Sequence, residues 1–166
     1  MSIAFLSIGT NLGNRENNLD HAIEKIEDYI GKILKSSSIY ETEPWGFQAR
    51  NEFLNMVVMV ETELIPSMLL EKVLNIESLL GRVRAKKHYT TAYSSRLIDI
   101  DILLYDNLII NEPDLKVPHP VMHHRKFVLV PLCDIASDMV HPVLKKSFRS
   151  LLEICEDKGE VTKYKD

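Results

Sequence analysis

Residues 96–105 read Arg-Leu-Ile-Asp-Ile-Asp-Ile-Leu-Leu-Tyr, an apolar stretch that contains two carboxylates and neither Gly nor Pro. Such a density of β-branched and large apolar residues predicts a β-strand. Side chains alternate between the two faces of a strand, so every second residue is expected to face the core. On this pattern the core face holds Ile98, Ile100, Ile102 and Leu104.

Asp99 and Asp101 fall on the opposite face of this predicted strand, beside Leu97 and Leu103. The rise per residue separates their backbone positions by roughly 6.5–7 Å. Two bare charges in an otherwise apolar strand are costly, so a cation is expected between them. The stretch alone leaves two interpretations open. One is an edge strand whose charges oppose aggregation, and the other is a metal site.

The chain has 166 residues, of which 45% are hydrophobic and 27% are charged, so we expect one soluble domain over residues 1–166 with a single core. The formal net charge of -4 gives no support for binding to nucleic acid or to an anionic membrane. Cys133 and Cys155 have no metal-binding spacing and favour reduced thiols. Because the sequence shows no basic leader and no apolar run of about 20 residues, we expect a cytoplasmic protein.

Apolar periodicity and turn residues predict the order strand, helix, strand, strand, helix, strand, which is typical of a ferredoxin-like α+β core with helices packed on an antiparallel sheet. The first helix is expected to end near Gly31, and Pro66 opens the second helix. Beyond this βαββαβ core we expect a short strand at 108–110, a helix at 147–154 and a polar, frayed tail at 156–166. The core strands are predicted at residues 3–8, 33–41, 53–62 and 96–105.

Two segments without any acidic residue flank the strand that carries the two aspartates, one between Glu77 and Asp99 and the other between Asp114 and Asp134. This combination fits a polyphosphate that is held by Mg²⁺ on the aspartates and by Arg, Lys and His from the flanks. A pair of solvated basic loops is the alternative, but it does not explain the absence of acids. The basic residues are Arg82, Arg84, Lys86, Lys87, His88 and Arg96 in the first segment and Lys116, His119, His123, His124, Arg125 and Lys126 in the second.

Other polar residues each have a structural and a functional interpretation. Phe53 and Asn55 share one face of their predicted strand, which suits either core packing or a pocket for a flat, hydrogen-bonding ring. Glu77 lies on or beside the apolar face of its helix, where an Arg from the following segment would suffice as its partner. His119 stands between two prolines, a rigid setting that can direct its imidazole toward a phosphate.

The chain carries a series of short motifs, in a fixed order, that together resemble the 6-hydroxymethyl-7,8-dihydropterin pyrophosphokinase family. The resemblance covers nearly the whole chain, and the combination is far more specific than any single motif. The motifs are Gly-Thr-Asn-Leu-Gly at 9–13, Tyr-Glu-Thr-Glu-Pro-x-Gly at 40–46, Phe-Leu-Asn at 53–55, Glu-x-x-x-Gly-Arg-x-Arg at 77–84, Arg-x-Ile-Asp-Ile-Asp-Ile-Leu at 96–103, Val-Pro-His-Pro at 117–120 and Arg-x-Phe-Val-Leu at 125–129.

The resemblance implies an ATP-dependent enzyme that transfers the terminal pyrophosphate of ATP to the hydroxymethyl oxygen of the pterin and leaves AMP. Its small-molecule substrates are ATP and the hydroxymethyl dihydropterin, and two Mg²⁺ ions are expected on Asp99 and Asp101. The resemblance assigns catalytic roles to Arg82, Arg96, Asp99 and Asp101. It assigns the ATP site to Glu77, Arg84, Ile102, His119 and Arg125. It assigns the pterin site to Thr42, Pro44, Trp45, Gly46, Phe53, Asn55 and Phe127, with the two phenylalanines as an aromatic clamp.

The sequence departs from the family pattern at a few positions. Tyr93, Ser94 and Ser95 stand where many members have Trp-Gly-Pro, and Leu74 and Pro120 replace residues that are polar or Tyr in some members. None of these changes removes an expected metal ligand or phosphate-binding Arg. Two other functions stay open: a palm-type nucleotidyl transferase or cyclase, and a non-catalytic ferredoxin-like module that senses a ligand.

Overall fold

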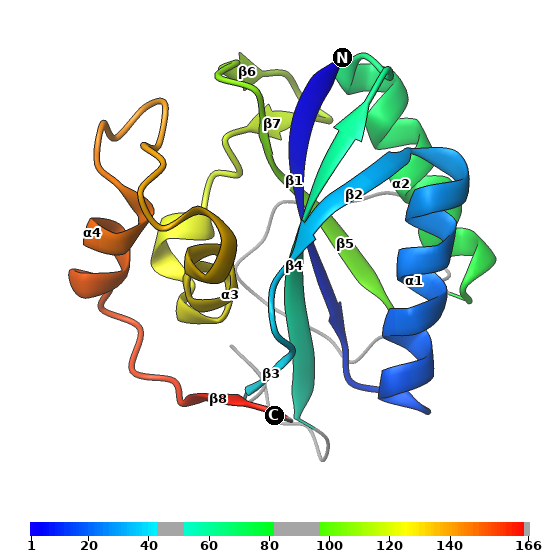
Figure 1. The fold of residues 1–166 in the computed structure, drawn as a ribbon, viewed down its shortest axis with the longest axis horizontal. Helices are drawn as coiled ribbons and strands as arrows, with labels where there is room; N and C mark the ends of the chain where they lie inside the picture. Colours follow the sequence, from blue (N-terminus) through cyan, green and yellow to red (C-terminus); the bar gives the residue numbers. More distant parts are fainter. Residues whose placement is uncertain (43–51, 82–96, 165–166) are drawn as a thin grey trace.

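The computed structural model describes residues 1–42, 52–81 and 97–164. Its elements are a mixture of strands and helices, and among these described elements the first two helices are separated by three successive strands (Figure 1). The strands are β1 (Ser2–Thr10), β2 (Gly31–Ser36), β3 (Tyr40–Thr42), β4 (Phe53–Thr62), β5 (Asp99–Tyr105), β6 (Ile110–Asn111), β7 (Lys116–Val117) and β8 (Val161–Lys163). The helices are α1 (Arg15–Tyr29), α2 (Pro66–Leu79), α3 (Lys126–Ala136), α4 (Phe148–Glu153) and the 3₁₀ turn Met122–His124.

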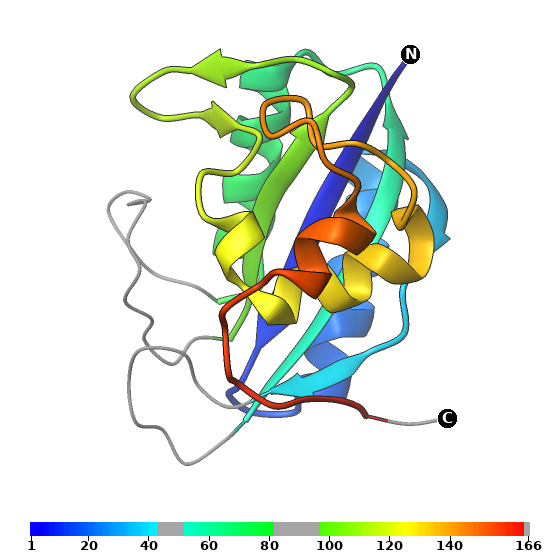
Figure 2. The ribbon, with the colours of Figure 1, turned by 90° about the vertical axis from the view of Figure 1, so that its left-hand side faces the viewer.

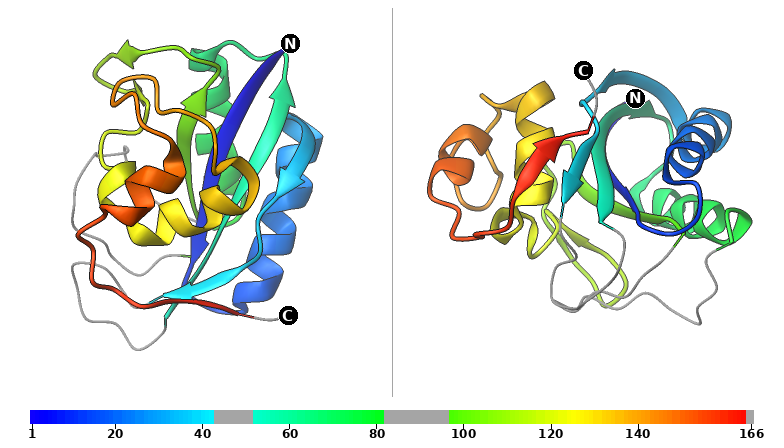
Figure 3. Two further views of the ribbon diagram at one scale, coloured as in Figure 1. Left: turned by 60° about the vertical axis from the view of Figure 1, so that its left-hand side comes forward. Right: turned by 90° about the horizontal axis from the view of Figure 1, so that it is seen from below.

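The main sheet has the strand order β5-β1-β4-β3-β8, and β2 also pairs with β4. All of these pairings are antiparallel among the described strands. The sheet lies between two helical layers, with α1 and α2 on one face and α3 and α4 on the other (Figure 3). The predicted α+β class, with helices packed on an antiparallel sheet, is confirmed.

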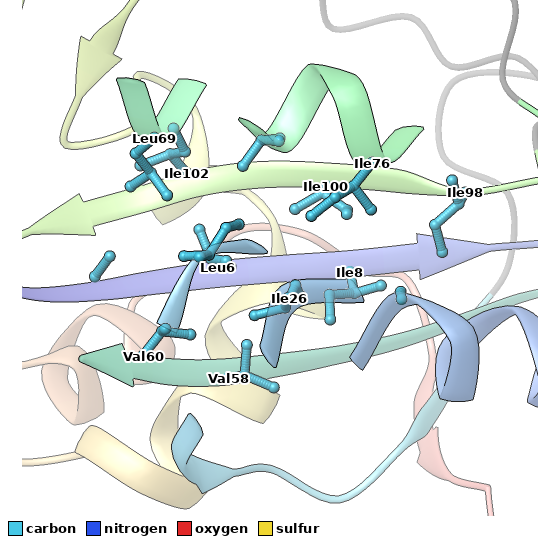
Figure 4. Packing of buried hydrophobic residues seen from close by; sticks show 14 of the residues in the cluster. Leu6, Ile8, Ile26, Val58, Val60, Leu69, Ile76, Ile98, Ile100 and Ile102 are labelled. Atoms are coloured by element: carbon cyan, nitrogen blue, oxygen red, sulfur yellow. The ribbon is translucent and has the colours of Figure 1, made fainter. Parts of the chain in front are cut away.

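Both faces of the sheet are buried, so the expectation of a single core is wrong. Because helices cover the sheet on both sides, its strands contribute apolar side chains to two separate clusters within the described residues. The first cluster lies between the sheet and α1 and α2, as Figure 4 shows for Leu6, Ile26, Ile76 and Ile100. The second cluster joins the opposite face to α3 and α4, and Phe5, Val57, Leu103, Leu129 and Phe148 belong to it.

The predicted strand at 33–41 is wrong as a single element, because it forms β2 and β3 with a break between them. Both strands pair with β4, one along each half of it. At the break, the backbone N–H of Ser37 donates to the carbonyl of Val57, and the N–H of Val57 donates to Ser37 Oγ. A side-chain hydroxyl therefore takes the position of a ladder carbonyl, and the regular pairing is interrupted there.

The side-chain alternation predicted for β5 holds for the isoleucines but fails at Leu104. Ile98, Ile100 and Ile102 belong to the first cluster, whereas Leu103 and Leu104 both belong to the second. Opposite β1, Leu6 pairs with Ile102 and Phe5 pairs with Leu104, so Leu103 is an extra residue. Such a bulge reverses the alternation that follows it. The strand also begins at Asp99, later than the predicted residue 96.

The C-terminal tail was expected to fray, and this expectation is wrong. β8 pairs with β3 and covers its edge, and the N–H of Tyr164 continues the pairing by donating to the carbonyl of Ile39 (Figure 2). The Tyr164 hydroxyl lies 3.0 Å from Glu16 Oε1, and the Arg15 guanidinium lies 5.6 Å from the Tyr164 ring centroid. The tail is thus held by its pairing with β3, which covers an otherwise open strand edge, and by side-chain contacts to the start of α1.

The helix ends mostly follow their local sequence. Asn14 accepts the N–H of Asn17 at 3.1 Å and caps α1, and Ser147 accepts the N–H of Ser150 at 3.1 Å and caps α4. α1 ends just before Gly31, as predicted, and Pro66 lies in the first turn of α2.

The short strand predicted at 108–110 is shifted to β6, which pairs with β7 in a separate ribbon. Among the described helices, none is long and apolar enough to cross a membrane.

His141 organises the loop between α3 and α4. Only 4% of this residue is exposed, and its Nδ1 accepts the N–H groups of Val143 at 3.2 Å and Leu144 at 3.1 Å. A proton on Nδ1 would oppose both donors. Burial lowers the pKa of His141, and His123, whose ring centroid lies 6.1 Å away, lowers it further.

We predict that the free energy of unfolding decreases as the pH falls below about 6.5, the ordinary pKa of histidine. In this range the unfolded chain takes up a proton that His141 in the folded chain does not, so acid favours unfolding, by up to about 1.4 kcal/mol per pH unit for one group. H141N keeps an oxygen that can accept the same N–H groups and should reduce this slope in urea titrations at pH 5 to 7. H21N, at an exposed histidine of α1, is the matched control. An unchanged slope in H141N would contradict the assignment.

Candidate active site

Three paired residues from β5, β1 and β4 form a row on the face of the sheet that α3 covers. Gly9 pairs with Asp99 on one side and with Asn55 on the other. Residues that are directly opposite in antiparallel strands share a face, with Cβ atoms about 4.5–5.5 Å apart. The row therefore contains a carboxylate, a glycine and an amide in adjacent positions, and only 7% of Asp99 and 4% of Asn55 is exposed.

Gly9 is a site residue to which the sequence reasoning gave no role of its own. A Cβ atom at this position would lie 2.9 Å from Asn55 Oδ1, so the missing side chain leaves space for the amide. Asn55 Nδ2 donates to Thr42 Oγ1 at 2.9 Å, which orients the amide with Oδ1 over Gly9. A glycine inside an apolar strand is a signal of such a close approach and could have identified this residue.

The strand that carries Thr42 is anchored to the helix above it. The Tyr40 hydroxyl donates to the carboxylate of Asp134 on α3, at 2.8 Å from each oxygen, and Asp134 also accepts the N–H of Ser38 at 3.1 Å. Burial and this carboxylate raise the pKa of Tyr40 to about 12, so the hydroxyl remains a donor at neutral pH. β3 thus has a fixed position beside Asn55.

Asp101 lies on the same face as Asp99 and is 9% exposed, so the predicted pairing of the two carboxylates on one strand face holds. His119 Nε2 lies 4.0 Å from Asp101 Oδ1. The His119 backbone N–H donates to the carbonyl of Leu103 at 2.9 Å, and Nδ1 accepts the N–H of Val121 at 3.4 Å. In the neutral ring the proton is therefore on Nε2, which faces the carboxylate.

Glu77 and Ile102 connect β5 to its surroundings. Glu77, only 2% exposed on α2, accepts the N–H of Ile100 at 2.8 Å through Oε2. The Arg partner that was predicted for Glu77 would come from a segment outside the described residues. Ile102 contributes its side chain to the first cluster, and it also lines a small pocket together with Asp101 and His119.

Arg125 and Phe127 lie at the start of α3, on the same side of the sheet as the polar row. Arg125 is 4% exposed, and its guanidinium carbon lies 5.8 Å from the centroid of the Phe127 ring. Phe53, 4% exposed, pairs with Thr42 at the end of β4. A buried cation and two aromatic rings thus lie on the α3 side of the sheet, and these are the residues to which the family resemblance assigns a phosphate contact and an aromatic clamp.

The structure describes ten of the sixteen predicted site residues. It brings Asp99, Asp101 and His119 together on one side and Thr42, Phe53 and Asn55 on the other. The predicted site residues that lie outside the described residues are Pro44, Trp45, Gly46, Arg82, Arg84 and Arg96.

The donor set of the two aspartates suits Mg²⁺. In the part of the chain that the structure describes, no group of three or more His, Cys, Asp and Glu side chains could hold a metal ion. Mg²⁺ commonly takes one or two carboxylates and completes its shell with phosphate oxygens and water. The two buried carboxylates therefore fit a magnesium ion that arrives with a phosphate ligand.

Comparisons with known proteins identify the family of this chain. The family model for 7,8-dihydro-6-hydroxymethylpterin-pyrophosphokinase (HPPK) matches residues 5–137. The 2-amino-4-hydroxy-6-hydroxymethyldihydropteridine pyrophosphokinase of Aquifex aeolicus is 38% identical over 149 residues, which are 90% of this chain and 89% of the relative. The enzyme of the same name from Porphyromonas gingivalis is 43% identical over 143 residues, 86% of this chain and 95% of the relative.

Solved structures show the same fold. A Plasmodium falciparum HPPK-DHPS structure superposes with a TM-score of 0.75 at 21% identity, over 92% of this chain and 45% of that one. The chain thus spans less than half the length of the solved chains that it matches. At this identity the likeness concerns the fold alone, and the family rests on the sequence matches. The chain belongs to the 7,8-dihydro-6-hydroxymethylpterin-pyrophosphokinase family of enzymes.

Proposed function

We propose that this chain transfers the terminal pyrophosphate of ATP to 6-hydroxymethyl-7,8-dihydropterin, giving AMP and the pterin diphosphate in folate biosynthesis. The activity would belong to a single domain of residues 1–166, with a ferredoxin-like core in which β2 and β3 together form the second strand. The observation that carries the proposal is the row Asp99, Gly9 and Asn55. Two strand spacings, about 9–10 Å, separate the carboxylate from the amide.

This separation suits a flat ring with a reactive arm. The Asn55 amide, held by Thr42, offers hydrogen bonds to the edge of a pterin. Phe53 and Phe127 are apolar surfaces from β4 and α3 for the two faces of the ring. A pterin on Asn55 would extend its hydroxymethyl group across the side-chain-free Gly9 toward Asp99. From the family resemblance, Pro44, Trp45 and Gly46 complete the pterin site.

The acidic end of the row supports the ATP site. Asp99 and Asp101 would hold two Mg²⁺ ions, and Mg²⁺ neutralises phosphate charge when bound. His119 can donate from Nε2 to a phosphate oxygen, and buried Arg125 supplies a fixed positive charge on the same side of the sheet. The residues that would complete the ATP site are Glu77, Arg82, Arg84, Arg96 and Ile102.

A product assay tests the function directly. The chain is incubated with ATP, Mg²⁺ and the hydroxymethyl dihydropterin, and the nucleotide and pterin products are separated by chromatography. We expect equal amounts of AMP and pterin diphosphate. Release of pyrophosphate would indicate a nucleotidyl transferase or cyclase, and ADP would indicate an ordinary kinase. No turnover, with nucleotide binding unchanged in D99A, would indicate a sensing module.

We predict that R82A and R96A reduce kcat by about 10²–10³-fold, because each arginine is expected to stabilise charge that develops on the phosphates. The dissociation constant for ATP should change much less, since the ground state gains less from these groups. Single-turnover kinetics and equilibrium ATP titrations distinguish the two effects. Equal losses in binding and turnover would count against a role in the transition state.

A second prediction concerns Gly9. Because the added methyl would lie 2.9 Å from Asn55 Oδ1, G9A should displace the amide and weaken pterin binding by about tenfold. ATP binding should change little. The effect should largely disappear in an N55A background, because the residues are coupled in contact. Additive losses in the double variant, measured by pterin fluorescence titration, would show that Gly9 acts elsewhere.

A further inference from the structure

Leu97 connects the catalytic strand to the start of the chain. It lies two residues before Asp99, and its carbonyl accepts two side-chain donors, the hydroxyl of Thr10 and Nδ2 of Asn18 at 3.2 Å. Thr10 is the last residue of β1 and is fully buried, and Asn18 lies in the first turns of α1. Two elements that are far from residue 97 in sequence thus hold its backbone.

The two donors form one network. Asn18 Nδ2 lies 3.0 Å from Thr10 Oγ1 and 2.8 Å from the carbonyl of Leu12, in the turn between β1 and α1. Thr10 therefore accepts from the amide and donates to Leu97. Hydrogen bonds in such a chain reinforce one another, and loss of the Thr10 hydroxyl would leave Asn18 as the remaining donor of this network to the Leu97 carbonyl.

This network extends the β1–β5 pairing. The backbone register between these strands ends where Gly9 pairs with Asp99. Thr10 is the next residue of β1, and its hydroxyl bonds Leu97 just beyond that last pair. A side-chain hydrogen bond thus continues the β1–β5 pairing beyond its last backbone pair. The network therefore restrains the backbone just before Asp99, where β5 begins.

The side chain of Leu97 lies beside two glycines whose backbone φ angles are in the left-handed region. Gly13 has φ +66° and Gly81 has φ +98°. A Cβ at Gly13 would lie 3.5 Å from one terminal methyl of Leu97, and a Cβ at Gly81 would lie 2.8 Å from the other. The backbone conformation therefore favours glycine at both positions, and a side chain at Gly81 would also displace a terminal methyl of Leu97.

We propose that Thr10, Asn18, Gly13 and Gly81 form a seat for Leu97 that positions Asp99 for its metal. These are positioning residues, since they act through Leu97 and the backbone of β5. The inference rests on the proposed function, and it gives a role to Thr10 and Gly13 of the motif at 9–13, to which no role was assigned. Loss of these contacts should change the position of Asp99 and leave pterin binding at Asn55 unchanged.

The test compares two buried threonines. Thr62 is 1% exposed, and its hydroxyl donates to the carbonyl of Ile30 at 2.8 Å, at the opposite end of the sheet. T10V should lower kcat by about ten- to a hundredfold and raise the Mg²⁺ concentration for half-maximal activity, with the pterin dissociation constant unchanged. T10S keeps the hydroxyl and should retain the kcat and the Mg²⁺ requirement of the parent chain. T62V should lose comparable stability and leave both kinetic values unchanged.

N18A provides a second variant if T10V does not fold, with N17A, at the adjacent exposed asparagine, as its control. Hydrogen exchange of the Asp99–Asp101 amides gives a readout that does not depend on turnover, and it should be faster in T10V and N18A only. If the parent chain forms no AMP and pterin diphosphate, the proposed function fails while the exchange result still tests the seat. If the parent is active and T10V matches T62V in kinetics and exchange, the seat is refuted.

Discussion

The structure depends on the register of β1, which is hydrogen-bonded to β4 on one edge and to β5 on the other. This double pairing aligns Asp99, Gly9 and Asn55, which are far apart in the sequence. A slip of one residue in either pairing would turn a set of side chains to the other face. Buried apolar clusters on both faces prevent such a slip, because it would bring Asp99, Asp101 or Asn55 into the first cluster.

β5 and β3, which contribute residues to the candidate site, each have an edge whose backbone groups are hydrogen-bonded by residues from elsewhere in the chain. At β5, Glu77 accepts one edge N–H and His119 donates to one edge carbonyl. At β3, β8 supplies backbone partners. Arg15 Nη1 lies 2.9 Å from Glu41 Oε2 and 2.8 Å from the carbonyl of Glu52, and so joins the ends of β3 and β4. The same contacts that protect strand edges therefore hold the polar row in shape.

Sequence patterns were reliable where a long segment has one periodicity. The limits of β4 and the start of α2 agree with prediction because an apolar run and a first-turn Pro define them locally. The patterns failed at the break after Ser36, at Leu104 and at β8. Each failure reflects a partner outside the segment. The Ser37 hydroxyl bonds to β4, and the bulge at Leu103 is defined by the register with β1. Residues 161–163 form a strand because they pair with the edge of β3.

The sequence by itself determined the family to which this protein belongs. Its two aspartates and acid-free basic segments predicted a polyphosphate held by Mg²⁺, because residue type and spacing limit the ligands that a site can bind. Its ordered motifs carry the family resemblance that implies a pterin substrate. Only the tertiary structure decided how these groups are combined. The amide across Gly9, the histidine beside Asp101 and the seat of Leu97 all join residues that are distant in the chain. Their contacts depend on strand register and on packing on both faces of the sheet, and no local pattern encodes either.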